Sequence, residues 1–183
     1  MSGIVGGGGS KSGVIGEIGL GVSHLTHFSL TTNDTVVDGK ITNWNDPSTP
    51  LSNSGSIGEL VSESAGVFTL PTGGMWMIQA VFQTNHVAGD NWVIAQLWKS
   101  NGTPVILAES FGGVTLTGGS TTHASQGNSC ALNYIVKEQG NTFEFRTSSI
   151  SNSGSYMYGA ASWTVGAQES YVTFMKLGNS SST

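Results

Sequence analysis

The stretch that decides the fold reads Gly66-Val67-Phe68-Thr69-Leu70-Pro71-Thr72-Gly73-Gly74-Met75-Trp76-Met77-Ile78-Gln79-Ala80-Val81-Phe82-Gln83. It holds two runs of strand-forming residues, 67–70 and 75–84, separated by a link that begins at Pro71 and ends at Gly74. Proline fixes φ and glycine tolerates unusual φ values, so this link suits a tight reversal. The stretch therefore predicts a β-hairpin.

The second run of this stretch is apolar on both sides. Strand side chains alternate between two faces. One face carries Trp76, Ile78, Ala80 and Phe82. The other carries Met75, Met77, Gln79 and Val81. Both apolar faces of such a strand must be buried. One face packs against the other sheet of its own domain, and the other face packs against a second molecule, most simply another copy of the chain.

Composition favours strands over helices. The 183 residues include 27 glycines but only 11 Asp or Glu and 6 Lys or Arg, so hydroxyls, amides and backbone must solvate the surface. No window combines a 3.6-residue apolar period with the charged outer face that helices usually carry. We therefore expect one all-β domain that is almost free of helix.

Charge and hydropathy argue against two classes of partner. The basic residues are spread from Lys11 to Lys176 without a cluster, and the formal net charge is −5, so we expect no nucleic-acid binding. Apolar runs are shorter than the roughly 18 residues of a membrane span, so we expect no membrane partner. The first residues lack the basic-then-apolar build of a secretory signal. One cysteine, Cys130, cannot form an internal disulfide, which fits a reducing cytoplasm.

Residues 1–21 are interpreted as a glycine-rich N-terminal attachment arm. Its glycines give it too much backbone entropy to fold alone. Its aliphatic residues nevertheless make it more hydrophobic than a Gly/Ser linker, and they are Ile4, Val5, Val14, Ile15, Ile18 and Leu20. We expect the arm to become ordered when it binds a partner. The alternative is a flexible tail that binds nothing. A jelly-roll domain over 22–178 and a polar tail over 179–183 complete the expected organisation.

Strand-like runs separated by turns follow at a spacing of about ten residues. They cover 24–32, 36–44, 92–99, 105–111, 129–137, 142–147 and 171–177, with a weaker run over 156–165. Asp38-Gly39 is a turn candidate, and Ser100-Asn101-Gly102 is a turn after which 105–111 is expected to pair back with 92–99. Gln139-Gly140-Asn141 predicts a further hairpin between 129–137 and 142–147. Eight to ten short strands of this kind predict an antiparallel sandwich or jelly roll.

Several of these segments share a further pattern. Residues 66–71 followed by 74–78 give a glycine, aromatic, proline, glycine, aromatic order, 96–102 form a strand ending in a Lys-Ser-Asn-Gly turn, and 171–177 form a closing strand. In this order, together with the late strand and turn of 131–141, the segments resemble the tumour necrosis factor and complement globular-head superfamily. The resemblance spans about 23–178. It implies an antiparallel jelly roll that packs as a compact threefold trimer.

The resemblance also implies a role for each face of the 75–84 strand. Trp76, Ile78 and Phe82 would fill the sandwich. Met75, Met77, Gln79 and Val81 would line the threefold axis as the trimer interface.

The N-terminal run from Gly6 to Gly16 has Gly9-Ser10-Lys11-Ser12-Gly13-Val14-Ile15-Gly16 at its heart. It resembles leaders of virion proteins from marine and cyanobacterial bacteriophages. A phosphate-binding loop is rejected for this run, because Ser10 stands where that motif needs glycine and no helix pattern follows. With a trimeric jelly roll and no secretory signal, the leader points to a virus particle.

No catalytic, cofactor or metal site is expected. His24 and His27 face opposite sides of their strand, and no cluster of Asp, Glu or Cys accompanies them or His123. His86 lies near Asp90, but one carboxylate offers too few oxygens for calcium. Cys130 lies within a strand, where a free thiol is most often a small core residue.

The sequence also lacks the patterns of hydrolases. Its carboxylates are scattered without a close pair, and there is no nucleophile-elbow serine, so we expect no enzyme. Five tryptophans could form a sugar platform, although most are expected in the core or an interface, and they are Trp44, Trp76, Trp92, Trp98 and Trp163.

These inferences lead to one functional expectation. The chain is expected to be a structural virion protein, made in the host cytoplasm, that forms a homotrimeric knob on a phage capsid as a cement or decoration protein. Its partners would be itself and the major capsid protein or another virion protein. The alternative is a tail- or head-fibre tip that binds host-surface glycans through Trp or Tyr residues in its apical loops.

Overall fold

The computed structural model describes residues 22–34, 38–45, 56–71, 73–85, 92–113, 128–136, 141–148, 156, 157, 159 and 170–178. Within these ranges every regular element is a strand, and no helix that could cross a membrane is found. The ten strands are β1 (Leu25–Ser29), β2 (Ser62–Ser64), β3 (Val67–Thr69), β4 (Met75–Asn85), β5 (Trp92–Lys99), β6 (Val105–Gly113), β7 (Asn128–Val136), β8 (Thr142–Ser148), β9 (Tyr156–Met157) and β10 (Tyr171–Gly178).

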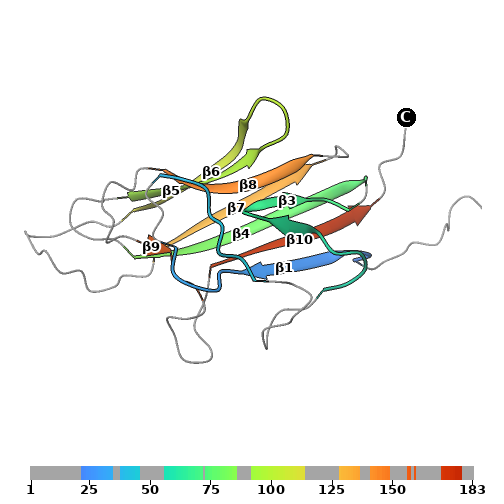
Figure 1. Cartoon of the computed structure of the whole chain (residues 1–183), viewed down its shortest axis with the longest axis horizontal. Coiled ribbons are helices and arrows are strands. Elements are labelled where there is room, and N and C mark those ends of the chain that lie inside the picture. The colour runs from blue at the N-terminus through green and yellow to red at the C-terminus, as the bar shows by residue number, and fades with distance from the viewer. Residues whose placement is uncertain are drawn as a thin grey trace, which may run out of the picture.

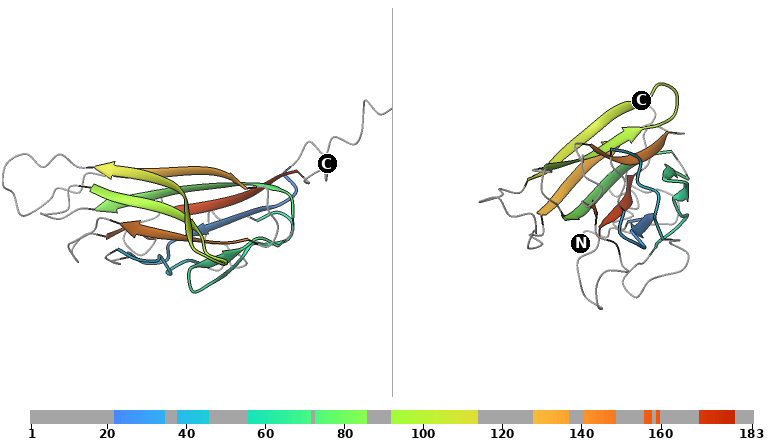
Figure 2. Two further views of the ribbon diagram at one scale, coloured as in Figure 1. Left: turned by 90° about the horizontal axis from the view of Figure 1, so that it is seen from above. Right: turned by 60° about the vertical axis from the view of Figure 1, so that its left-hand side comes forward.

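The strands form two antiparallel sheets that pack face to face (Figures 1 and 2). Sheet 1 has the order β1-β10-β4-β7, and β9 pairs with the end of β4. Sheet 2 has the order β2-β3-β8-β5-β6. This arrangement confirms the predicted antiparallel jelly-roll sandwich.

The predicted hairpin between 67–70 and 75–84 is wrong. Its first run, β3, lies in sheet 2 between β2 and β8, whereas its second run, β4, lies in sheet 1 between β10 and β7. The link from Pro71 to Gly74 therefore carries the chain from one sheet to the other. Both runs bury large side chains in the common core, Phe68 from β3 and Trp76 from β4, which places them on facing sheets.

Glycine is required at two turns of this region. Gly66 has a φ of +80° in the turn that joins β2 to β3, and a Cβ there would overlap the carbonyl oxygen of Ile41. The Gly66 N–H donates to Glu63 Oε1 at 2.5 Å, which closes the turn. Gly74 has a φ of +132°, and a Cβ there would lie 2.5 Å from the carbonyl oxygen of Gly178.

The hairpin that does form in this region joins β2 to β3, which pair antiparallel through the turn at Gly66.

The second predicted hairpin, between 129–137 and 142–147, is also wrong. β7 pairs with β4 in sheet 1, whereas β8 pairs with β3 and β5 in sheet 2. The predicted strand over 36–44 does not form in its described part, where only the isolated bridges of Lys40 to Arg146 and Trp44 to Leu30 occur. The β5–β6 hairpin is confirmed, and Gly102 in its turn has a φ of +75°.

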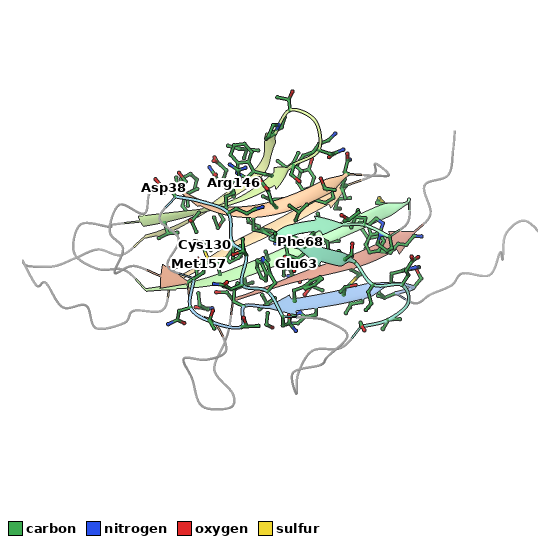
Figure 3. All side chains as sticks on the ribbon, viewed as in Figure 1. Asp38, Glu63, Phe68, Cys130, Arg146 and Met157 are labelled. Carbon is green, nitrogen blue, oxygen red and sulfur yellow. The ribbon has the colours of Figure 1, made fainter. Side chains whose placement is uncertain are left out.

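An aromatic cluster fills the space between the sheets. The Phe68 ring lies 5.0 Å from that of Phe28 and 5.6 Å from that of Phe145, in edge-to-face contacts between ring centroids (Figure 3). Phe174 and Trp44 also contact Phe68, at 5.1 and 5.4 Å. Because these rings come from both sheets and from the 38–45 segment, Phe68 ties the sandwich together.

Replacing Phe68 with alanine should lower the free energy of unfolding by about 3–5 kcal/mol, because the rigid rings around it cannot close the cavity. Equilibrium urea denaturation at one fixed protein concentration measures the change. Thr69→Ala is the matched control, since Thr69 is exposed, and its effect should stay within about 0.5 kcal/mol. A Phe68→Ala loss as small as that of Thr69→Ala would contradict the central role of this ring.

Candidate self-association surface

The outward side of sheet 1 is the candidate surface, and we call it the sheet 1 face. The strand registers align its side chains in three rows that cross β1, β10, β4 and β7 in that order. The first row is Leu25, Met175, Met77 and Ile135. The second row is His27, Thr173, Gln79 and Asn133. The third row is Ser29, Tyr171, Val81 and Ala131.

The two sides of β4 differ sharply in burial. Trp76, Ala80 and Phe82 are fully buried and Ile78 is 1% exposed, so the inward side belongs to the core. Met75, Met77, Gln79 and Val81 are all only partly buried in the single chain. At the β7 end of the first row, Ile135 is 55% exposed. The sheet 1 face is thus a broad surface of mainly apolar side chains that remains open to solvent in one copy.

A polar row runs through the middle of this surface. The Nδ1 of His27 shares a hydrogen bond of 2.9 Å with Thr173 Oγ1. Its Nε2 lies 3.4 Å from Ser29 Oγ, and its ring lies 5.2 Å from the Tyr171 ring between centroids. Burial lowers the pKa of His27. This histidine is therefore held in a fixed orientation within an otherwise uncharged surface.

The outward side of sheet 2 is built differently. Arg146 of β8 places its guanidinium 4.6 Å from the Trp98 ring centroid and pairs with Glu144 through Nε at 2.6 Å and also through Nη2 (Figure 3). Trp98 Nε1 donates to Gln96 Oε1 at 3.0 Å, and Gln96 Nε2 donates to Glu109 Oε1 at 2.6 Å. These polar groups satisfy one another within a single chain. On the same side of sheet 2, Phe111 and Ile106 of β6 remain 64% and 41% exposed.

The family comparisons and the curated sequences yield no match for this chain. Solved structures do match. Murine APRIL at pH 5.0 superposes with a TM-score of 0.57 at 9% identity, over 84% of this chain and 98% of APRIL. Eiger TNF from S. frugiperda superposes with a TM-score of 0.50 at 14% identity, over 88% of this chain and 90% of that one. The chain has a tumour necrosis factor-like jelly-roll fold.

The TNF-like fold brings together the four residues predicted to form an interface. Met75, Met77, Gln79 and Val81 lie along β4 on the sheet 1 face, next to β10 and β7. Sequence reasoning missed their neighbours on this face, above all Met175, Thr173 and Ile135. The alternation within 171–177 and 129–137 was visible, but nothing local indicated that these strands flank β4. The predicted arm residues Ile4, Val5, Val14, Ile15, Ile18 and Leu20 lie outside the described residues.

The tryptophans whose side chains the structure describes do not form a sugar-binding platform in the loops. Trp76 is fully buried and Trp44 is 8% exposed, both in the core. Trp98 lies on strand β5 against Arg146. The side chains of Trp92 and Trp163 lie outside the described part of the structure.

The histidines and the cysteine of the described residues lie apart. His24 packs its ring edge-on to Trp76 at 5.7 Å, on the opposite side of β1 from His27, as the strand alternation predicts. Among the residues that the structure describes, no three His, Cys, Asp or Glu side chains are placed to share a metal ion. Cys130 is fully buried, and its Sγ lies 3.6 Å from the carbonyl oxygen of Val93. Burial raises the pKa of its thiol to about 11.

The buried Cys130 thiol should resist modification in the native protein. At a pH of about 8 its thiolate fraction is roughly 100-fold smaller than that of an unperturbed thiol, and burial blocks access as well. Reaction with Ellman's reagent should therefore be at least about 100-fold slower in native buffer than in concentrated urea. A native rate close to the unfolded rate would contradict the placement of Cys130 in the core.

Proposed function

We propose that this chain is a non-enzymatic structural protein of a virion. It forms a homotrimeric knob through the sheet 1 face and attaches to a bacteriophage capsid through its N-terminal arm, as a cement or decoration protein. The observation that carries the proposal is the sheet 1 face, whose mainly apolar side chains stay open to solvent across four neighbouring strands of a single chain.

The apolar side chains of the sheet 1 face favour self-association, because association would bury them. Met77, Met175 and Ile135 form an apolar row across three strands, and Val81, Tyr171 and Ala131 form another. Each apolar side chain that a second copy covers contributes about 25 cal/mol per Å² removed from water. A second copy of the chain can cover this surface, whereas a monomer would leave its apolar side chains in contact with water.

A closed ring of three copies fits the resemblance drawn from the sequence. If a different edge of each copy covered the sheet 1 face of the next, the contact would be head-to-tail, and such contacts close into a ring when the rotation permits. The β6 edge of the sandwich offers apolar groups for this purpose, since Phe111 is 64% exposed and Ile106 is 41% exposed. Met75, Met77, Gln79 and Val81 would then lie toward the threefold axis.

Attachment to a shell would follow from mass action. Three arms on one trimer bind with a higher effective concentration than three separate arms, so weak contacts by Val14, Ile15 and Ile18 become strong together. A protein that binds the assembled shell but not its free subunits stabilises the shell. The resemblance of residues 6–16 to phage virion leaders supports a capsid as the partner.

The double substitution Met77→Asp and Val81→Asp should convert the trimer to a monomer, because it would bury two carboxylates per chain in an apolar contact. Light scattering coupled to size exclusion gives the mass in solution. Both side chains point away from the core, so circular dichroism should be unchanged.

The matched control places the same charges on the outward side of sheet 2. Ser62→Asp and Thr69→Asp change two exposed positions of β2 and β3 and should leave the mass unaltered. A Met77→Asp and Val81→Asp variant that stays trimeric would rule out the sheet 1 face as the interface.

Replacing the six aliphatic arm residues with serine should abolish binding to capsids while leaving the trimer intact. Co-sedimentation with capsids that lack this protein measures binding. The control is Ser2→Ala, Ser10→Ala and Ser12→Ala, which alters the arm without removing apolar groups and should bind as the original chain does. A trimer that never binds capsids, but binds a glycan array saturably, would replace this proposal with a fibre-tip function.

A further inference from the structure

The polar row of the sheet 1 face lies between its two apolar rows. His27, Thr173, Gln79 and Asn133 align across four strands, with Met175 and Met77 on one side and Tyr171 and Val81 on the other. His27 lies two strands from Gln79, which is about 10 Å at the usual strand spacing. A stable interface covers about 800 Å² on each partner, so a contact centred on β4 extends to His27.

The surroundings of His27 contain no opposite charge among the described residues. Thr173 and Tyr171 face it from β10, and Ser29 faces it from its own strand. Gln79 and Asn133, farther along the row, are neutral. Both hydroxyls near the ring can accept a hydrogen bond from an imidazolium, but neither offsets its charge.

The charged and titratable groups on the neighbouring elements lie elsewhere. Lys176 on β10 is 8% exposed and pairs in register with Trp76, on the inward side. Glu59 belongs to the 57–61 segment, which meets β1 at Leu25 and at Thr26, whose fully buried side chain lies on the side of β1 opposite to His27. His24, the residue before β1, packs against Trp76. Among the described residues, none that faces His27 would neutralise a proton added to it in a covered sheet 1 face.

We propose that His27 makes the self-association of this chain acid-labile, so that the sheet 1 face is joined at neutral pH and released in mild acid. The inference rests on the proposed function, because it describes how the same surface is regulated. The neutral ring keeps its bonds to Thr173 and Ser29 inside the contact. The protonated ring must either stay in water or carry its charge into an apolar interface.

The sign of the pH dependence follows from the shift at His27. Burial lowers the pKa of the ring already in the free folded chain. Covering the sheet 1 face removes more water from the ring and lowers its pKa further, so the free chain binds a proton at a higher pH than the associated chain does. Association therefore weakens as the pH falls through the lowered pKa of the free chain, below the ordinary histidine value of 6.5. One proton per chain weakens association by up to about tenfold per chain for each pH unit within this window.

Sedimentation velocity of the full chain between about pH 7.5 and 5 tests the inference. The original chain should shift from the associated to the dissociated form as the pH falls. His27→Gln keeps a polar side chain without a titratable group and should remain associated across the range. His24→Gln is the matched control and should dissociate as the original chain does, because His24 lies on the other side of β1.

The outcomes separate the inference from the proposed function. A chain that associates at neutral pH and stays associated in acid overturns the role of His27 but leaves self-association standing. Acid dissociation that persists in His27→Gln also overturns it. A chain that is monomeric at every pH overturns both proposals.

If His27→Gln does not fold, NMR titration of the histidine rings in the original chain decides. A His27 signal that titrates at or above 6.5 in the associated state refutes the inference.

Discussion

Strand β4 imposes the main constraint on this molecule, because its side chains alternate and both sets are largely apolar. The inward set, with Trp76 and Phe82, is fully buried, and the Phe82 ring contacts that of Phe145 on sheet 2. The outward set, with Met77 and Val81, could enter that core only if β4 turned over, which would expose the inward set to solvent. The sandwich therefore satisfies half of β4 and leaves the other half as a surface. The neighbours β10 and β7 extend this surface, since their registers place Met175 and Ile135 beside Met77.

The two broad faces of the sandwich show how differently a sheet can meet solvent. On sheet 2, Arg146, Glu144 and Trp98 bind one another, while Phe111 and Ile106 stay exposed on β6. On sheet 1, an apolar row runs without interruption from Met175 through Met77 to Ile135. The continuity of this row over several strands, rather than the number of exposed apolar residues, marks the sheet 1 face as a surface for association.

Local pattern predicted the strands well but not their partners. The run 92–99 and its return at 105–111 are joined by a short turn, and the β5–β6 hairpin was correct because its pairing is local. The links after Leu70 and after Val136 have equally good turn residues, yet both cross between sheets. Turn chemistry reports that the chain reverses, not which sheet receives it. The candidate surface was predicted for β4 alone for the same reason, because its neighbours on β10 and β7 are distant in sequence.

The strand order of sheet 1 has a consequence for how the protein is made. β10 lies between β1 and β4, although it follows every other strand in the sequence. Among the strands that the structure describes, only β2–β3 and β5–β6 pair with a neighbour in sequence, so most pairings must wait for long loops to close, and such topologies fold slowly. A nascent chain on the ribosome cannot join β1 to β4 until residues 171–178 have left the exit tunnel. Until then, one edge of β4 lacks the strand whose backbone groups pair with it in the folded protein.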